Sequence, residues 1–237
     1  MRSTSSILPV LALALGAAAD QDWHFGDTIY MGPTSGSTYL KKLTYSLVPP
    51  AVPTDSSQSD AWLSIWVGIS ASQSDNSIPL MQPLLNWAPD NAAQGCPADN
   101  DAWCVAASTL LPTGQTDEPY VAVPIGSTLD FEIETTSSGT VSQKVSINGE
   151  VSSTITNSNI GENPKWVIAS NECYSNQCGS LDGYTWANMT ITLSAAEESF
   201  GDSLSMTGAT SDGFTSSDNG LTWTGSIKFN ADKWPSS

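Results

Sequence analysis

Apolar and polar residues alternate at every second position along most of the chain, and helical periodicity is almost absent. Clusters of Gly, Pro, Ser, Asn and Asp separate the alternating stretches, and these residue types favour turns and loops. The pattern therefore predicts an all-β protein. The predicted strands cover residues 39–48, 62–69, 80–87, 120–124, 129–134, 141–147, 151–156, 165–170, 186–193 and 221–229.

Two of these stretches carry additional information. Residues 62–69 place Leu, Ile and Val on one strand face and two tryptophans on the other. Because both faces are partly apolar, this strand is expected to be central in its sheet. Asn148 and Gly149 lie between two alternating segments, and Asn-Gly is typical of a type I′ turn. We expect a hairpin there.

About ten strands must pack as two sheets or close into a barrel, because a single open sheet would leave an apolar face in water. We predict an antiparallel two-sheet sandwich of the concanavalin A-like jelly-roll type. The Ser-rich stretches 55–60 and 211–219 are predicted surface loops, and no fixed-period repeat or linker divides the chain. Residues 20–237 are therefore expected to form one domain, acting as a monomer.

The N-terminus has the pattern of a secretory signal peptide. Arg2 supplies the positive charge, residues 7–16 the apolar segment, and the three alanines at 17–19 a small-residue cleavage site. We expect residues 1–19 to be removed, a mature chain that begins at Asp20, and a secreted protein. No later stretch approaches the roughly 20 apolar residues of a membrane-spanning helix, so no membrane partner is expected.

The chain is strongly acidic, with a formal net charge of −17 at pH 7, and Arg2 is its only arginine. This balance excludes nucleic acid as a partner, and it disfavours polyanionic polysaccharides, because bidentate recognition of phosphate and carboxylate relies on arginine. A polysaccharide lyase acting on uronates ranks low for the same reason. The acidity fits acid surroundings, where carboxylates are protonated and repel one another less.

Four cysteines form two close pairs in the sequence, Cys96 with Cys104 and Cys173 with Cys178. Of the three possible connectivities in an exported chain, these two local disulfides are favoured. A Cys₄ zinc site is the disfavoured alternative, since the spacings differ from zinc-binding motifs, and we expect no metal and no cofactor. Asn188 begins an Asn-Met-Thr sequon and is a predicted glycosylation site.

Histidine chemistry is limited, because His24 is the only histidine and is expected on the surface of a terminal strand. A His-rich metal site is therefore impossible, and a Ser-His-Asp triad would depend on that one residue. The G-x-S-x-G, H-E-x-x-H and phosphate-loop motifs are absent. Carboxylate or amide chemistry is what remains.

One row of carboxylates is a candidate catalytic site. Asp130, Glu132 and Glu134 alternate with Phe131 and Ile133, so the three acids project from one face of one strand. In glycoside hydrolases of the concanavalin-like class, acids spaced this way act as nucleophile and proton donor. The alternative is that the apolar residues fill the core and the acids face solvent, with no lysine or arginine close in sequence to tune them.

Tryptophan is a second candidate feature. The chain has nine tryptophans, several of them close to Asn, Gln or Asp. Exposed indole rings beside amides bind sugar rings by stacking and hydrogen bonding, whereas buried ones fill a sandwich core. The sequence leaves both roles open for Trp66, Trp87 and Trp103, which are the candidate ligand-binding residues.

Five short motifs follow one another in a set order and span most of residues 64–193. The agreement of their spacing is more informative than any one of them. The motifs are Trp66-Val67-Gly68-Ile69, Leu80-Met81-Gln82, Asp101-Ala102-Trp103, Pro124-Ile125-Gly126-Ser127-Thr128-Leu129 and Lys165-Trp166-Val167.

This order resembles the glutamic peptidases of fungi, the eqolisins. The resemblance implies a secreted, acid-active double-sheet sandwich from a fungus, in which a Gln and a Glu share one concave face. It also implies that the Glu is the general base that activates water, while the Gln polarises the scissile carbonyl. The family Gln falls on Gln82, where the following Pro83 predicts a strand edge or bulge.

The resemblance also places the family Glu at Val105, and residues 103–111 contain no carboxylate. A peptidase without its base would lose several powers of ten in rate, on the order expected for general-base catalysis. The prediction is therefore a protein that binds a neutral polysaccharide or peptide without cleaving it. The alternative is an active acid hydrolase: a peptidase that uses Asp101, Asp117 or Glu118 instead, or a glycosidase that uses the 130–134 row.

Overall fold

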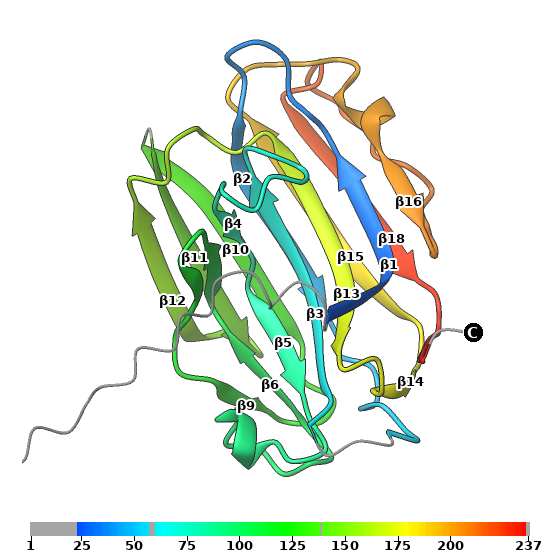
Figure 1. The fold of residues 1–237 in the computed structure, drawn as a ribbon. Coiled ribbons are helices and arrows are strands. Elements are labelled where there is room, and N and C mark those ends of the chain that lie inside the picture. The colour runs from blue at the N-terminus through cyan, green and yellow to red at the C-terminus, as the bar shows by residue number, and fades with distance from the viewer. Residues whose placement is uncertain (1–22, 57–59, 138, 236–237) are drawn as a thin grey trace, which may run out of the picture.

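The structure is a computed structural model, and it describes residues 23–56, 60–137 and 139–235. Two antiparallel sheets lie face to face and form a sandwich (Figure 1). The predicted signal peptide, residues 1–19, lies outside the described residues. None of the helices in the described part of the chain is long and apolar enough to span a membrane.

The first sheet, called sheet A here, contains ten strands. Four of them run in the order β16, β1, β13, β3, and beyond β3 the sheet divides into two short ladders, β4-β7-β8 and β5-β6-β9. The bounds are β1 (Trp23–Met31), β3 (Trp62–Ser70), β4 (Leu80–Met81), β5 (Leu84–Trp87), β6 (Trp103–Ala106), β7 (Ser108–Leu111), β8 (Gly114–Asp117), β9 (Val121–Val123), β13 (Trp166–Tyr174) and β16 (Ser205–Thr207).

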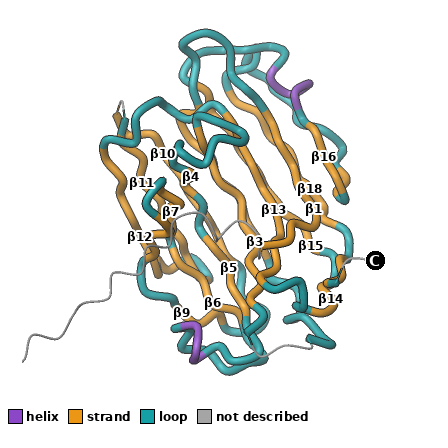
Figure 2. Tube along the Cα trace, viewed as in Figure 1, coloured by secondary structure: helices purple, strands orange, loops and turns teal. Residues whose placement is uncertain are grey.

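The second sheet, sheet B, has seven strands in the order β12-β11-β10-β2-β15-β18-β17. Two further strands, β14 (Gly179–Leu181) and β19 (Asp232–Trp234), pair at one end of the sandwich. Short 3₁₀ turns, η2 (Ala92–Gln94) and η3 (Phe200–Ser203), lie at opposite ends (Figure 2). The bounds in sheet B are β2 (Leu40–Leu47), β10 (Leu129–Ser137), β11 (Thr140–Ile147), β12 (Glu150–Ser158), β15 (Tyr184–Leu193), β17 (Ala209–Thr210) and β18 (Thr222–Phe229).

All ten predicted strands are present, and the predicted all-β sandwich is confirmed. The 80–87 strand is split at Gln82 and Pro83, as the proline indicated. The alternation did not predict β1, which is interrupted by a Gly-Asp bulge. It did not predict β6, which lies in the continuous apolar run 103–107, or the short strand β7 that follows it. The Asn148-Gly149 turn is confirmed, since both residues have positive φ, 52° and 84°.

The core lies between the sheets. The inward face of β3 is fully buried along its length, and β3 is flanked by strands on both sides, as its two apolar faces predicted. On the facing sheet, Phe131 stacks on Tyr45 with 4.7 Å between ring centroids, and Trp186 meets both rings edge-on. Removing one such buried aromatic side chain costs about 3–5 kcal/mol, so this stack holds the two sheets together.

Both predicted disulfides are present, Cys96–Cys104 and Cys173–Cys178, with Cα separations of 5.7 and 5.9 Å. They exclude the alternative of a Cys₄ zinc site. Disulfides are consistent with an extracellular protein. Asn188, the predicted glycosylation site, is exposed at a bulge in β15 with φ 53°. Its glycosylation stays a prediction.

Candidate functional site

The face of sheet A that points away from the core is called the outer face here. Along β3, Leu63 and its alternate neighbours enter the core, so the intervening Trp62, Ser64, Trp66 and Gly68 stand on the outer face. Residues that pair in neighbouring strands project to the same side of a sheet, so the strand register shows which side chains of the other strands share the outer face. The outer face therefore collects side chains from β1, β13, β3, β5 and the β4–β7 ladder.

An apolar floor covers the middle of the outer face. Trp66, Leu84 and Ile168 pack on one another at 4–6% exposure, although none of them is part of the inter-sheet core. Three partly exposed side chains border this floor: Tyr30, Leu80 and Trp166. An apolar cluster on the outside of a sheet is unusual for a face that only contacts water, and larger patches of this kind mark interaction surfaces.

Glu172 is the carboxylate beside this floor. It lies on β13, paired with Ser64 on one side and Phe25 on the other. Trp66 Nε1 donates to Glu172 Oε1 over 3.0 Å. Burial raises the pKa of Glu172 to about 7, against the lowering effect of the Trp66 hydrogen bond. The group is therefore a neutral carboxylic acid at acid pH, able to donate a hydrogen bond as well as accept one.

Gln82 lies at the other end of the floor, where the 80–87 segment breaks. Its backbone N–H donates to the Ser108 carbonyl over 2.9 Å. A Cβ on Gly68 would lie 2.9 Å from Gln82 Cβ, so the absence of a side chain at Gly68 makes room for the glutamine. Gln82 is 4% exposed, its Nε2 lies 3.5 Å from Gln115 Oε1, and its Oε1 has no partner in the described structure.

A chain of polar side chains borders the face on the β7–β8 side. Gln115 Nε2 donates to Ser108 Oγ, Ser108 Oγ donates to Asp117 Oδ1, and Tyr120 Oη lies 3.4 Å from Asp117 Oδ2. Asp117 is thus the carboxylate linked to Gln82, through Gln115 and Ser108, but it is exposed. Burial and the Asp117 charge raise the pKa of Tyr120, so that its hydroxyl stays neutral.

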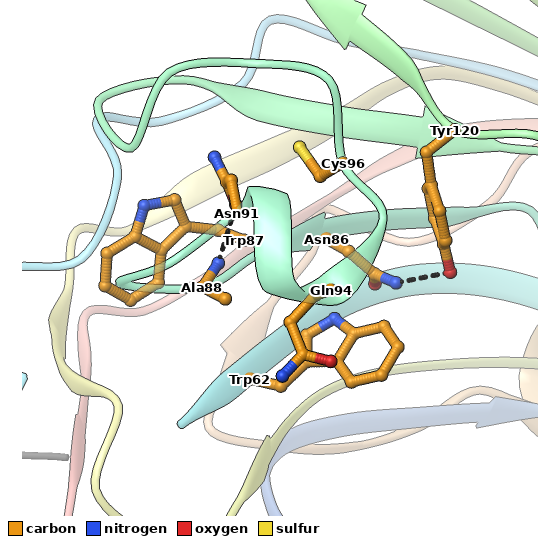
Figure 3. A pocket seen from close by; sticks show the side chains of 8 residues that line it. All are labelled: Trp62, Asn86, Trp87, Ala88, Asn91, Gln94, Cys96 and Tyr120. Atoms are coloured by element: carbon orange, nitrogen blue, oxygen red, sulfur yellow. Dashed lines mark hydrogen bonds between the residues drawn. The ribbon is translucent and has the colours of Figure 1, made fainter. Parts of the chain in front are cut away.

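This series of hydrogen-bonded side chains leads to a small hollow at the edge of the sheet, where Asn86 points toward Tyr120 above the ring of Trp62 (Figure 3). The Asn86 amide lies 2.7 Å from the Tyr120 hydroxyl and 2.6 Å from the Ser64 hydroxyl. The hollow is bounded by η2 and has no room for even a water molecule. This hollow therefore cannot hold a ligand.

Gln82 and Glu172 do not form a pair. Gln82 is level with Gly68, whereas Glu172 is level with Ser64, four residues away along β3. That offset corresponds to about 13 Å. The residue of β13 level with Gln82 is Ile168, which pairs with Gly68, and beyond it is Tyr30. In the described part of the chain, the strand positions on this side of Gln82 hold no carboxylate, whereas on the other side Ser108 is level with Gln82 and pairs with Asp117.

The structure corrects the position inferred for a lost glutamate. Val105 is completely buried in the inter-sheet core, whereas Gln82 stands on the outer face. A carboxylate at position 105 would thus point away from Gln82. Asp101 lines a different surface, beside Pro50 and Trp103, so it does not approach Gln82 either.

The structure also corrects the carboxylate row as a catalytic candidate. Glu132 and Glu134 stand on the outer face of sheet B, while Phe131 and Ile133 are in the core. Lys42 Nζ lies 2.7 Å from Glu132 and 3.6 Å from Glu134, and Lys144 Nζ lies 2.7 Å from Glu132. Partial burial acts to raise the pKa of Glu132, but the lysine hydrogen bonds prevail and lower it. A lowered pKa makes Glu132 a poorer proton donor at acid pH than an unpaired glutamic acid.

Two of the three candidate tryptophans are also corrected. Trp87 and Trp103 belong to the inter-sheet core at 5% and 3% exposure, and their indole N–H groups donate to the carbonyls of Asn100 and Pro50. Neither ring has a face free to stack on a ligand. Trp66 does stand on the outer face, as part of the apolar floor.

Sequence reasoning missed Glu172 and Ile168. The predicted strand ended at residue 170, whereas β13 continues to Tyr174. Trp166 and Ile168 are alternate residues on one strand face. Extending this alternation to positions 170 and 172 would have placed Glu172 on the same face. His24 is exposed on β1, as expected.

No protein-family model matches this sequence, and no curated protein matches it significantly. Among solved structures, scytalido-glutamic peptidase with a transition-state analogue inhibitor matches with a TM-score of 0.53 and 16% identity, covering 85% of this chain and 96% of that chain. A second structure of that peptidase, with a peptide-based transition-state analogue, gives 0.50 and 16%, covering 86% and 97%. SCP-B, a member of the eqolisin family in complex with the tripeptide Ala-Ile-His, gives 0.48 and 16%, covering 86% and 96%. The chain therefore has an eqolisin-like fold that is divergent in sequence.

Proposed function

We propose that this protein binds an extended, neutral peptide on the outer face of sheet A and does not hydrolyse it. The observation that carries the proposal is the row of residues level with Gln82. On the β3–β13 side this row holds Gly68, Ile168 and Tyr30 and no carboxylate, and on the other side its carboxylate, Asp117, is two strands away and already accepts a hydrogen bond from Ser108. Glu172, the carboxylate beside the apolar floor, is about 13 Å away along the strand and cannot act on the same bond as Gln82.

The chemistry of the face supports a peptide as the ligand. Tyr30, Leu80 and Trp166, the partly exposed border of the floor, offer apolar contact for alternate side chains of an extended chain. The buried amide oxygen of Gln82 has no partner among the described residues, and it can accept a backbone N–H when the exposed Gln115 side chain beside it moves aside. The two peptidase structures with TM-scores of 0.50 or more were solved with transition-state analogues, one of them peptide-based, which adds a fold-level analogy.

Binding can be tested directly. Peptides from digested casein, labelled with fluorescein, are titrated with the protein at pH 4 and followed by anisotropy. Tyr30→Ala and Trp166→Ala remove the rim of the floor, and each is expected to weaken binding about tenfold, as for a contact worth roughly 1.4 kcal/mol. Val151→Ala, which truncates a 60% exposed side chain on sheet B, is the matched control and should bind like wild type.

The same assay includes neutral β-glucans. The reason is an aromatic group at the end of the outer face, in which the Trp23 ring centroid lies 6.2 Å from that of Trp62 and 5.5 Å from that of Tyr174. Retention of glucan without peptide binding, lost in Trp62→Ala, would replace the peptide by a neutral polysaccharide. Equal binding by wild type and both floor variants would refute the outer face as the site.

A second candidate function is acid hydrolysis centred on Glu172. The observation that favours it is the raised pKa of Glu172, about 7, in contact with the Trp66 indole. A carboxylic acid that keeps its proton at pH 4 can protonate a leaving group. Turnover of casein or β-glucan at pH 3–5 that Glu172→Gln abolishes, and Gln82→Ala does not, would establish this alternative.

A further inference from the structure

A bulge in β1 aims a carboxylate into the protein. The pairing of β1 with β13 is interrupted between Phe25 and Thr28, and the two bulged residues are Gly26 and Asp27. Asp27 is 7% exposed. Its backbone N–H donates to Asp232 Oδ2 over 3.2 Å. Carboxylates from the first and last strands of the described chain therefore lie side by side, away from the outer face of sheet A.

Two glycines and an asparagine shape the space around these carboxylates. A Cβ on Gly26 would overlap Asp232 Oδ2 and lie 2.5 Å from Asn171 Oδ1, and a Cβ on Gly208 would overlap Asp27 Oδ1. The Asn171 and Asp232 oxygens are thus both within 2.5 Å of one point. That separation lets one cation touch both oxygens at the 2.3–2.6 Å typical of calcium.

The cluster contains several unpartnered polar atoms. Asp27 Oδ2, both amide atoms of Asn171 and the Tyr184 hydroxyl are buried and have no hydrogen-bond partner in the described structure. Asn171 is completely buried and Tyr184 is 5% exposed. Each such group costs about 1–3 kcal/mol when left unpaired, and in native proteins a water or ion commonly satisfies them.

The charge of the cluster is also uncompensated. The ion pairs found among the described residues are formed by Lys42 and Lys144 on sheet B, not here. A buried carboxylate beside a second, partly buried one is unfavourable unless a proton or a metal ion compensates their charge.

We propose that Asp27, Asp232 and Asn171 form a binding site for one calcium ion. Carboxylate and amide oxygens suit a hard cation, and the Tyr184 hydroxyl can donate to a carboxylate of the same shell. Water completes the shell, since no group of three or more His, Cys, Asp or Glu converges among the described residues. The ion connects β1, β13 and β19, and so ties both ends of the described chain to sheet A.

The test is a calcium titration of the full mature protein at pH 7.5 after removal of metal with EDTA. We expect one calcium ion per chain in equilibrium dialysis. At about 100 times the Kd, the melting temperature should rise by about 5 °C or more. Magnesium should act more weakly, because it requires a smaller and more regular octahedral shell.

Variants distinguish this site from non-specific binding to an acidic protein. Asp232→Asn and Asn171→Leu should abolish both the stoichiometric binding and the thermal shift. Glu162→Gln, which removes one exposed carboxylate and makes the same charge change as Asp232→Asn, should retain both. If the site variants do not fold, the number of calcium ions bound per wild-type chain still tests the proposal.

Three results would overturn the proposal. The first is the absence of stoichiometric calcium binding by the wild type. The second is an equal thermal shift in Asp232→Asn and Glu162→Gln. The third is stabilisation by acid alone, equal in EDTA and in calcium, which would mean that a proton shared by the two carboxylates takes the place of the metal.

Discussion

At the scale of single residues, the chemistry open to the outer face depends on the residues in the same row across sheet A as Gln82. Gly68 carries no side chain between Gln82 and Ile168, where the end of the Leu80 side chain lies instead, and Ile168 contributes only an apolar side chain there. An amide alone can polarise a carbonyl, but it cannot take a proton from water. The residue at position 168 therefore decides between binding and hydrolysis in this account.

Ile168→Glu is therefore expected to gain hydrolytic activity. The new carboxylate would be on the same row as Gln82, with only the flexible end of the Leu80 side chain between them. We expect slow hydrolysis of denatured casein at pH 3–5, measured by release of acid-soluble peptides, where the wild type gives none. Ile168→Gln, of similar size, is the matched control and should stay inactive, and adding Gln82→Ala to Ile168→Glu should remove the activity. Activity in Ile168→Gln would contradict the assignment.

Glu172 makes a prediction about stability and pH. Its pKa is raised from 4.5 to about 7 in the folded state, so the folded state binds the proton more tightly than the unfolded state does. Its contribution to stability is therefore complete below about pH 4.5 and is lost as the pH rises to about 7.

Glu172→Gln should remove this loss of stability at higher pH. The difference in unfolding free energy between pH 4 and pH 8, measured by urea denaturation, should be smaller in the variant by about 2–3 kcal/mol. Glu162→Gln, an exposed carboxylate on a loop, should behave like wild type. If the unfolding free energies of Glu172→Gln and wild type depend on pH in the same way, burial does not shift the pKa of Glu172.

At the scale of elements, the break between β4 and β5 positions Gln82. Gly68 on β3 lies against this break, and a Cβ there would be 2.6 Å from the Met81 carbonyl oxygen and 2.9 Å from Gln82 Cβ. Gly68→Ala is therefore expected to displace the segment and to destabilise the protein by about 1–3 kcal/mol, measured by urea denaturation. Peptide affinity should fall as well. If Gly68→Ala is as stable as wild type, the backbone around Gln82 can move to accommodate the added methyl group at little cost in free energy.

Alternation along the sequence predicted ten strands because one face of each is buried, and it predicted the core side chains of β3 and β10 for the same reason. It could not predict which face β6 turns to the core, since residues 103–107 are apolar without alternation. It also could not show that Lys42 would neutralise Glu132, because the two are joined only by the β2–β10 register. Contacts between strands distant in sequence require the folded structure.

At the scale of the whole molecule, the two outer faces have different chemistry. Sheet B presents carboxylates paired with Lys42 and Lys144, as a solvated face does. Sheet A presents an apolar floor, neutral amides and one carboxylic acid that is uncharged at acid pH. With a net charge of −17, the protein would repel acidic ligands at neutral pH, so a neutral ligand is the one this asymmetry favours.

The most direct test of the central claim follows the ligand itself. Peptides from a casein digest are incubated for a day at pH 4 with an equimolar amount of the protein, and bound and free fractions are identified by mass spectrometry. The account predicts that specific peptides are retained by wild type, are lost in Trp166→Ala, and are recovered intact. New termini among the recovered peptides, absent when Gln82→Ala is used, would show a working peptidase and contradict the account.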